Sequence, residues 1–231
     1  MTDELPGEIV DLLQEVDAFI AAEVRPLEQA DDNARFFDHR REYARTDFEN
    51  GGRPSAEWEA LLEQMVARAD RAGLWRFALP EELGGRGGSN FALAVVREHL
   101  NRLGIGLHND PQSEVSMIGN FPTVILAHEF GTPAQKEAFV APALRREAGL
   151  AFGLTEPNHG SDATYLETSA RRDGEEWVID GVKRFNSGMH RASHDLVFAR
   201  TSGAPGEPRG ITAFIVARDA PGLTVEFLWW T

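Results

Sequence analysis

Directly after a short apolar run, the chain reads Phe152-Gly153-Leu154-Thr155-Glu156-Pro157-Asn158-His159-Gly160-Ser161-Asp162. Pro, Asn, Gly, Ser and Asp favour turns, so this composition is typical of an ordinary connecting loop. The backbone amides and the hydroxyls of Thr155 and Ser161 could also bind an anionic or heteroaromatic ligand. Loops both connect elements and carry binding sites, so the residues by themselves leave the two interpretations open.

On the N-terminal side of this stretch the chain has a helical pattern. Apolar residues recur at three- and four-residue steps from Ile9 to Val24, and Pro26 is expected to end this helix. The run Thr132-Pro133-Ala134-Gln135 is typical of a capping box that opens a later helix. The sequence predicts helices over about 9–25, 55–72, 89–103, 114–130 and 132–146.

On the C-terminal side the pattern becomes that of strands. Segments rich in Val, Ile, Thr, Phe and Trp are bounded by turn formers, and Asp173-Gly174 is typical of a two-residue hairpin turn. Helices first and strands afterwards predict an α+β fold, with an N-terminal all-α domain over 1–148 and an antiparallel β domain over 149–231. The expected strands cover 150–155, 164–172, 175–180, 194–201, 210–217 and 223–230.

Composition excludes several classes of function. The chain of 231 residues has 23 Lys and Arg against 37 Asp and Glu, a net charge of −14, which is the wrong sign for a sequence-independent nucleic-acid binder. The absence of Cys excludes disulfides, thiolate catalysis and Cys-based metal sites. No apolar run is long enough to span a membrane, and residues 1–30 are too acidic for a secretory signal, so a cytoplasmic location is expected.

Five segments in the same order resemble the acyl-CoA dehydrogenase family. Thr155–Asp162 is similar to its flavin-binding signature Thr-Glu-Pro-x-x-Gly-Ser-Asp, and Gly181–Gly188 to its Gly-x-Lys-x-Trp-Ile-Thr-Asn stretch. Three weaker matches are Leu79–Gly85, Gly131–Lys136 and Gly210–Val216. The resemblance covers roughly residues 74–231, and residues 35–52 look like an insertion.

The resemblance implies a fold of three domains. They are an N-terminal helical domain, a middle β domain and a C-terminal helical bundle, and this chain would supply the first and most of the second. The usual catalytic glutamate of the family would lie in the third, so no catalytic base is assigned within this chain. Glu156 and Asp162, the acidic residues of the signature, are expected to be structural.

The resemblance also assigns six cofactor-binding residues. Phe152, Leu154 and Thr155 match positions that line the flavin, and Ser161 matches one near the pyrophosphate of FAD and the acyl-CoA. Phe185 takes the place of the aromatic residue that packs on the flavin ring, and Ser187 that of the threonine near flavin N5.

This sequence departs from the family pattern at a few positions. Phe185 and Ser187 keep the chemistry of the usual Trp and Thr, whereas Asn158-His159 replaces a pair of small residues. Asn186 is polar where the family is apolar. Outside these motifs, His190 and His194 have a spacing that would suit a metal only on a helix, and no metal site is expected there.

The expected function is FAD-dependent dehydrogenation of an acyl-CoA thioester to a trans-2-enoyl-CoA. An electron-transferring flavoprotein would take the electrons, and the protein would be a homo-oligomer, either a dimer or a tetramer. Two alternatives stay open. One is an acyl-CoA oxidase or flavin monooxygenase on the same scaffold, and the other is a non-catalytic subunit that completes the active site of a partner.

Overall fold

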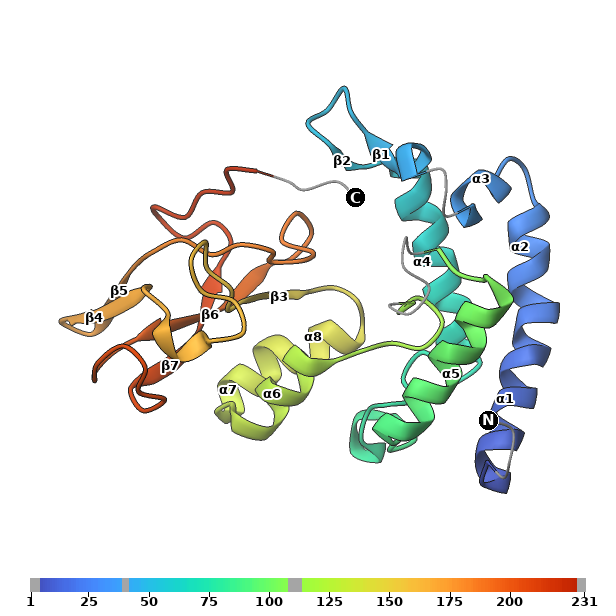
Figure 1. Ribbon diagram of the computed structural model, residues 1–231, viewed down its shortest axis with the longest axis horizontal. Coiled ribbons are helices and arrows are strands. Elements are labelled where there is room, and N and C mark those ends of the chain that lie inside the picture. Colours follow the sequence, from blue (N-terminus) through green and yellow to red (C-terminus); the bar gives the residue numbers. More distant parts are fainter. Residues whose placement is uncertain (1–4, 39–41, 108–113, 228–231) are drawn as a thin grey trace. The chain divides into compact units, whose positions relative to one another are not determined.

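A computed structural model describes residues 5–38, 42–107 and 114–227 (Figure 1). The described residues divide into two compact units, one up to Phe121 and one over 122–227. The helices that follow Pro122 therefore belong to the same compact unit as the sheet. The domain boundary expected at residue 148, where the sequence pattern changes, stays a prediction.

The first unit consists of helices and one short hairpin. Val16, Met65 and Leu100 come from three different helices and are buried in one apolar core. Burial of each such side chain contributes about 1.5–3 kcal/mol. The elements in order are α1 Gly7–Phe19, a π-helical segment Ile20–Val24, α2 Arg25–Gln29, α3 Ala34–Phe37, a 3-10 turn Glu42–Arg45, β1 Thr46–Asp47, β2 Arg53–Pro54, α4 Ala56–Arg71, a 3-10 turn Glu81–Leu83 and α5 Asn90–Leu103.

Pro26 does not end the first helix, so this expectation is wrong. The helix continues through the π-helical segment into α2, which ends at Gln29. In the π-helical segment the N–H of Arg25 donates to the carbonyl of Ile20, five residues earlier. This wider turn leaves room for a proline ring that would clash with a carbonyl in a regular helix.

The expected ends of the next two helices are confirmed. The hydroxyl of Ser55 accepts a hydrogen bond from the amide of Trp58 at 3.3 Å, and α4 begins at the next residue. The hydroxyl of Ser89 caps α5 in the same way, with the amide of Ala92 at 3.1 Å. Gly104 follows α5 with a φ of 61°, in the left-handed region that favours glycine.

The helix expected from residue 114 begins later, at Pro122. The buried carboxylate of Glu114 accepts hydrogen bonds from the backbone amides of Leu107, at 2.7 Å, and Ser116, at 2.5 Å. These side-chain bonds stabilise a loop in place of the helical pattern. The apolar residues between 114 and 122 that suggested a helix therefore pack into the core from a loop.

The second unit joins short helices to a five-stranded sheet. The capping box is confirmed, because the amide of Gln135 donates to Thr132 Oγ1 at 3.3 Å and the amide of Thr132 donates to Gln135 Oε1 at 2.9 Å. The elements are α6 Pro122–Phe130, α7 Pro133–Gln135, a π-helical segment Lys136–Val140, α8 Ala141–Leu144, β3 Leu150–Gly153, a 3-10 turn Ala163–Tyr165, β4 Ser169–Asp173, β5 Glu176–Asp180, β6 His194–Arg200 and β7 Ile211–Ala217.

Strand β6 is the centre of the sheet. It pairs antiparallel with β7 along its whole length, and on its other edge it pairs with β3 and then, at Arg200, with β4. The order of helices followed by a β-sheet domain is confirmed. The sheet is mixed and not purely antiparallel, because β3 and β4 both run parallel to β6.

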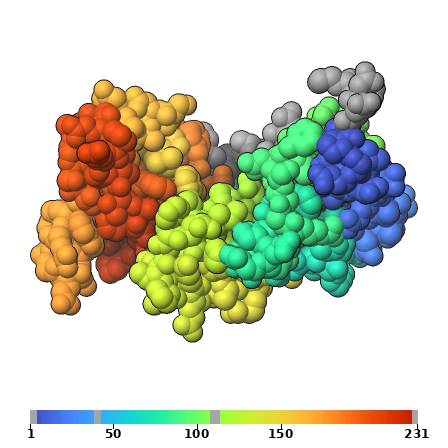
Figure 2. All heavy atoms as spheres, turned by 90° about the horizontal axis from the view of Figure 1, so that it is seen from below, coloured from blue at the N-terminus to red at the C-terminus, as the bar shows by residue number. Residues whose placement is uncertain are grey.

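The turn expected at Asp173-Gly174 is shifted by one residue to Gly174-Glu175, because Asp173 still pairs with Glu176, and Gly174 has a φ of 63°. The hairpin joins β4 to β5. It lies at the surface of the second unit, where most residues of both strands are exposed (Figures 1 and 2). No strand forms over 223–227, and the rest of the strand expected at 223–230, with Trp229 and Trp230, lies outside the described residues. In the described part of the chain, no helix combines the length and apolarity needed to cross a membrane.

Candidate functional site

The two segments that carry the flavin resemblance lie next to each other in the second unit. One follows β3 and the other precedes β6, and these two strands are paired. The amide of Arg184 donates to the carbonyl of Thr155 at 2.9 Å. Lys183 Nζ donates to the carbonyl of Leu154 at 3.2 Å. Strand pairing and these two bonds therefore bring together residues about thirty positions apart in the sequence.

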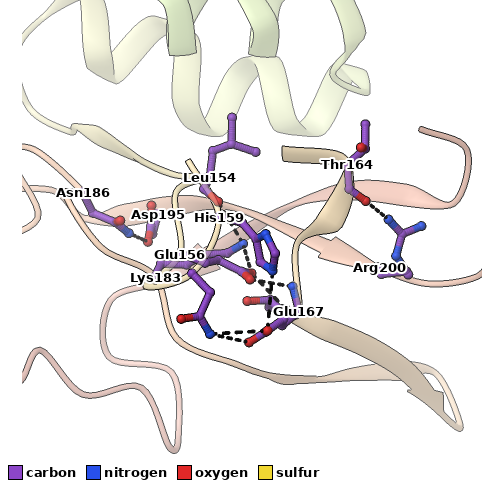
Figure 3. A network of polar contacts seen from close by, with 11 residues as sticks. Leu154, Glu156, His159, Thr164, Glu167, Lys183, Asn186, Asp195 and Arg200 are labelled. Atoms are coloured by element: carbon purple, nitrogen blue, oxygen red, sulfur yellow. Dashed lines mark hydrogen bonds and ion pairs between the residues drawn. The ribbon is translucent and has the colours of Figure 1, made fainter. Parts of the chain in front are cut away.

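A buried ion pair fixes the first segment to the second (Figure 3). Lys183 Nζ lies 2.7 Å from Glu156 Oε1, and the two side chains are only 8% and 2% exposed. The Glu156 carboxylate also accepts hydrogen bonds from the backbone amides of Glu167, at 2.5 Å, and Thr168, at 2.9 Å. One carboxylate thus connects the loop after β3, the two residues that precede β4 and the segment that follows β5.

The electrostatics of this pair keep the Glu156 carboxyl charged at neutral pH. Burial alone would raise the pKa of its carboxyl, but the hydrogen bonds from Lys183 and from the Glu167 and Thr168 amides lower the pKa to about 2. Burial lowers the pKa of Lys183, against the attraction of Glu156. Such a carboxylate is a poor proton acceptor at neutral pH, in agreement with the structural role expected for it.

The predicted residues of the first segment lie on β3 and in the loop that follows it. Phe152 is an exposed residue of β3, with its ring 5.2 Å from that of Phe198. Leu154 and Thr155 are half-buried directly after the strand, and Ser161 is exposed further along the loop. The structure therefore gathers these residues on one strand end and the adjoining loop.

The predicted residues of the second segment lie in a tight turn. Phe185 has a φ of 59°, a left-handed conformation that few residues with a side chain adopt. The amide of Ser187 donates to the carbonyl of Phe185 at 2.8 Å, and the Ser187 side chain is exposed. The ring of Phe185 is 61% exposed, with the Arg184 guanidinium 5.0 Å from its centre. Phe185 is therefore not part of the described core.

One contact between polar residues beside this turn was not predicted from the sequence. Asn186 Nδ2 donates to Asp195 Oδ2 at 2.5 Å, and Asp195 is only 4% exposed (Figure 3). Burial raises the pKa of the Asp195 carboxyl, against the hydrogen bond from Asn186 and the attraction of Lys183. The available signals were a polar residue at 186, where the family is apolar, and an acidic residue at the start of an apolar strand.

The two unusual residues of the signature loop contact its far end. His159 Nε2 lies 3.5 Å from Glu167 Oε1, and the ring of His159 stacks on that of Tyr165 at 6.1 Å. Asn158 Nδ2 donates to both carboxylate oxygens of Glu167 at 3.4 Å. These side chains therefore fold back onto their own loop.

The residues present fit a flavin dinucleotide. Such a ligand needs a planar apolar surface, hydrogen-bonding groups at its polar edge and donors for its pyrophosphate. The exposed ring of Phe185 offers the first, and the hydroxyls of Thr155 and Ser187, which have no hydrogen-bond partner in the described part of the chain, offer the second. The amides of Gly160 and Ser161 are equally unpaired there, and a Cβ added at Gly160 would meet nothing within 4 Å.

His190 and His194 lie just before and at the start of β6. His194 lies on β6, where its ring contacts the edge of Phe139 at 4.7 Å and its Nδ1 lies 3.1 Å from Ser193 Oγ. Within residues 5–38, 42–107 and 114–227, no three His, Cys, Asp or Glu side chains gather in a way that could hold a metal ion.

Comparison with known proteins agrees with this geometry. The family model described as "Acyl-CoA dehydrogenase, N-terminal domain" matches residues 31–147, and that described as "Acyl-CoA dehydrogenase, middle domain" matches residues 151–230. The chain belongs to the acyl-CoA dehydrogenase family. The middle-domain match contains both segments joined by Lys183 and Glu156.

Individual relatives of this acyl-CoA dehydrogenase family member support the same assignment. The chain is 36% identical to the human short-chain specific acyl-CoA dehydrogenase over 160 residues, which cover 69% of this chain and 37% of the relative. It is 34% identical to the 3-(aryl)acrylate reductase of Clostridium sporogenes over 166 residues, 70% of this chain and 41% of that protein. The chain thus spans about two fifths of the length of these curated relatives.

A solved structure described as "Tcur3481-Tcur3483 steroid ACAD" superimposes with a TM-score of 0.64 and 27% identity. The match covers 96% of this chain and 50% of the other. The described fold is therefore shared along nearly the whole chain, while half of the solved chain has no counterpart in it.

Proposed function

We propose that this chain forms the flavin-holding part of an FAD-dependent acyl-CoA dehydrogenase. The observation that carries the proposal is the join between the two signature segments. Lys183 and Glu156 hold them together, while the hydroxyls of Thr155, Ser161 and Ser187 are without hydrogen-bond partners in the described part of the chain. Side chains kept unpaired on a fixed frame are what a polar ligand requires.

The binding roles follow from the position of each group. The Phe185 ring would cover one face of the flavin ring system and exclude water from it. The hydroxyls of Thr155 and Ser187 would hydrogen-bond the polar atoms of the ring edge, and the Gly160 and Ser161 amides would bind the pyrophosphate. Phe152 and Leu154 would line the same ligand, and Ser161 would also contact the acyl-CoA.

FAD, when bound, accepts the hydride that leaves the β-carbon of the acyl-CoA. A carboxylate must remove the α-proton, and the Glu156 carboxylate is unsuited to this because its proton-accepting oxygens are already hydrogen-bonded. We assign the base to a region beyond residues 1–231. The product would be a trans-2-enoyl-CoA, the electron acceptor an electron-transferring flavoprotein, and the assembly a homo-oligomer.

The test is anaerobic titration of the FAD-loaded protein, with the region that supplies the base present, with acyl-CoAs of graded chain length. Loss of the oxidised-flavin absorbance, together with an enoyl-CoA product two mass units lighter than the substrate, is expected for a dehydrogenase. The Ser187→Ala variant should slow the loss, and Thr201→Val, just beyond the end of β6 that is far from the turn, should not. Rapid reoxidation by oxygen would identify an oxidase or monooxygenase, and FAD that does not bind would contradict the proposal.

A second candidate is a subunit that completes the active site of a partner. It is favoured by the similar solved structure whose description joins two names. In this case the same FAD-loaded protein, with the region beyond residue 231 present, would stay oxidised with every acyl-CoA and would be reduced only after a partner chain is added. Because one relative is named as a reductase, the same mixtures should also be tested with an enoyl substrate and reduced flavin.

A further inference from the structure

The turn that carries Phe185 and Ser187 is conformationally demanding. Phe185 and Gly188 both have positive φ, 59° and 82°. A left-handed conformation at a residue with a Cβ costs about 1–2 kcal/mol. Two backbone bonds close the turn, from the amide of Ser187 to the carbonyl of Phe185 and from the amide of Met189 to the carbonyl of Asn186, at 2.8 and 3.1 Å. A strained conformation persists only where its surroundings hold it in place.

Asp195 supplies a fixed point directly beneath this turn. It is the second residue of β6, and it pairs with Ala151 of β3 on one side and Val216 of β7 on the other. A strand flanked on both edges cannot shift easily, so its side chains are precisely placed. The hydrogen bond from Asn186 Nδ2 to Asp195 Oδ2, 2.5 Å long, connects the middle of the turn to this strand.

The neighbouring backbone is shaped around the pair. A Cβ at Gly153 would lie 2.9 Å from Asp195 Oδ2 and 3.0 Å from Asn186 Nδ2, closer than side-chain carbons approach such atoms. Glycine at 153 therefore gives the amide and the carboxylate the room to meet. Gly153 is also the last residue of β3, so the pair lies where the signature loop begins.

Burying this pair costs free energy of folding. A contribution to stability alone therefore does not explain it. Asp195 is buried, and Asn186 Oδ1 is buried without a hydrogen-bond partner in the described part of the chain. An unsatisfied buried acceptor costs about 1–3 kcal/mol. Two apolar side chains of similar size would avoid this cost.

We propose that the Asn186–Asp195 pair is a positioning device that holds the strained turn, and with it the Phe185 ring and the Ser187 hydroxyl, in place for the flavin. The inference rests on the proposed function for its ligand, and on the described geometry for its mechanism. The paired atoms of both residues face Gly153, so neither residue would contact the flavin through them. Both act through the turn.

A charge-swap series tests the pair in the full chain. Asn186→Asp places two carboxylates in contact and should break the bond. Asp195→Asn leaves an acceptor for the Asn186 amide and should be tolerated. The double variant Asn186→Asp with Asp195→Asn restores one N–H to carboxylate bond with the partners exchanged, and it should recover the wild-type behaviour.

Two readouts separate positioning from general stability. The first needs no flavin: the rate of tryptic cleavage after Arg184, at the start of the turn, should rise about tenfold or more in Asn186→Asp and return to within about threefold of wild type in the double variant. The second is the FAD dissociation constant, which should rise about tenfold, equivalent to ~1.4 kcal/mol, and recover in the same way. Thr201→Val, which removes 3.1 Å hydrogen bonds to the Gly210 carbonyl and to Thr212 of β7 just beyond the end of β6, should alter neither readout.

Each outcome supports or overturns the proposed role of the Asn186–Asp195 pair. If Asn186→Asp does not fold, Asn186→Ser, too short to reach Asp195, takes its place with the same expectation. Unchanged cleavage and unchanged FAD affinity in these variants would overturn the inference, as would a double variant that stays as impaired as Asn186→Asp. If wild type fails to bind FAD while the cleavage pattern is as expected, the proposed function falls and the positioning of the turn stands.

Discussion

The signature loop Thr155–Asp162 and the turn Phe185–Gly188 are each fixed by one buried carboxylate, but in opposite ways. Glu156 accepts three hydrogen bonds, one of them from Lys183, and its pKa lies at about 2. Asp195 accepts a short side-chain bond from Asn186, and burial raises its pKa. The loop is thus held by a carboxylate whose charge is stabilised by hydrogen bonds. The turn is held by a carboxylate whose burial costs free energy.

This difference separates two tasks within one candidate site. A saturated ion pair such as that of Glu156 contributes to the frame, since removing either partner leaves a buried charge unpaired. A strained turn on an incompletely satisfied pair contributes to the placement of side chains, because proteins retain such strain mainly at functional sites. We therefore expect variants of the loop to alter stability most, and variants of the turn to alter ligand binding most.

The largest effect is expected from Lys183→Met. It removes the ammonium and leaves Glu156 charged and buried, so the free energy of unfolding of the second unit should fall by about 3 kcal/mol. Urea denaturation, combined with hydrogen exchange resolved for residues 122–227, measures this. The control Arg171→Met breaks an exposed pair with Asp173 and should change the free energy by less than about 1 kcal/mol. Equal losses of stability in the two variants would show that the Glu156–Lys183 pair does not stabilise the second unit.

The next effect is a pH dependence carried by Glu156. Its pKa is about 2 when folded and near 4.5 when unfolded, so its contribution to stability is complete above pH 4.5 and is lost as the pH falls towards 2. Between pH 5 and 3 we expect the wild-type protein to lose about 2 kcal/mol relative to Glu156→Gln, which cannot titrate. Parallel stability curves for the two proteins between pH 5 and 3 would show that Glu156 is not charged and paired in the folded state.

Asp195 should give a smaller dependence of the opposite sign. Its folded pKa is raised, so the folded state binds the proton more tightly, and stability falls as the pH rises from the ordinary carboxyl value through the raised one. The Asp195→Asn substitution removes this slope. Urea titrations of wild type and Asp195→Asn from pH 4 to 7 should therefore diverge, with the variant gaining stability relative to wild type as the pH rises. A divergence in the other direction would mean that the carboxylate is stabilised and not merely tolerated.

Local signals in the sequence predicted much of the fold. The helix starts near Ser55 and Ser89 and the capping box at Thr132 depend on residues within four positions of one another, and they are confirmed. The hairpin between β4 and β5 is also found, but its two-residue turn lies one position later than expected, at Gly174-Glu175. The helix end expected at Pro26 was wrong because the π-helical turn before it does not follow from any simple residue pattern. The helix start expected at residue 114 was wrong because the buried carboxylate of Glu114 bonds to backbone amides and so competes with the helix.

The candidate site was predictable only in part. The resemblance located both segments, but the contacts that join them link residues far apart in the chain, such as Lys183 with Glu156. A single sequence cannot show that Asn186 and Asp195 meet, because strand pairing alone decides which residues lie beneath the turn. Strand β6 runs parallel to β3 for the same reason: the choice of partner is a property of the whole sheet.

The most direct test of the account is the effect of Phe185→Ala on FAD affinity and on the stability of the flavin-free protein. Because the ring is 61% exposed, its removal should lower the free energy of unfolding by less than about 1 kcal/mol, while FAD binds about tenfold or more weakly. Phe185→Trp, which restores the usual aromatic residue of the family, should keep both properties. If Phe185→Ala instead lowers stability by about 3–5 kcal/mol and leaves FAD affinity unchanged, Phe185 is a core residue and the second flavin segment is wrongly assigned.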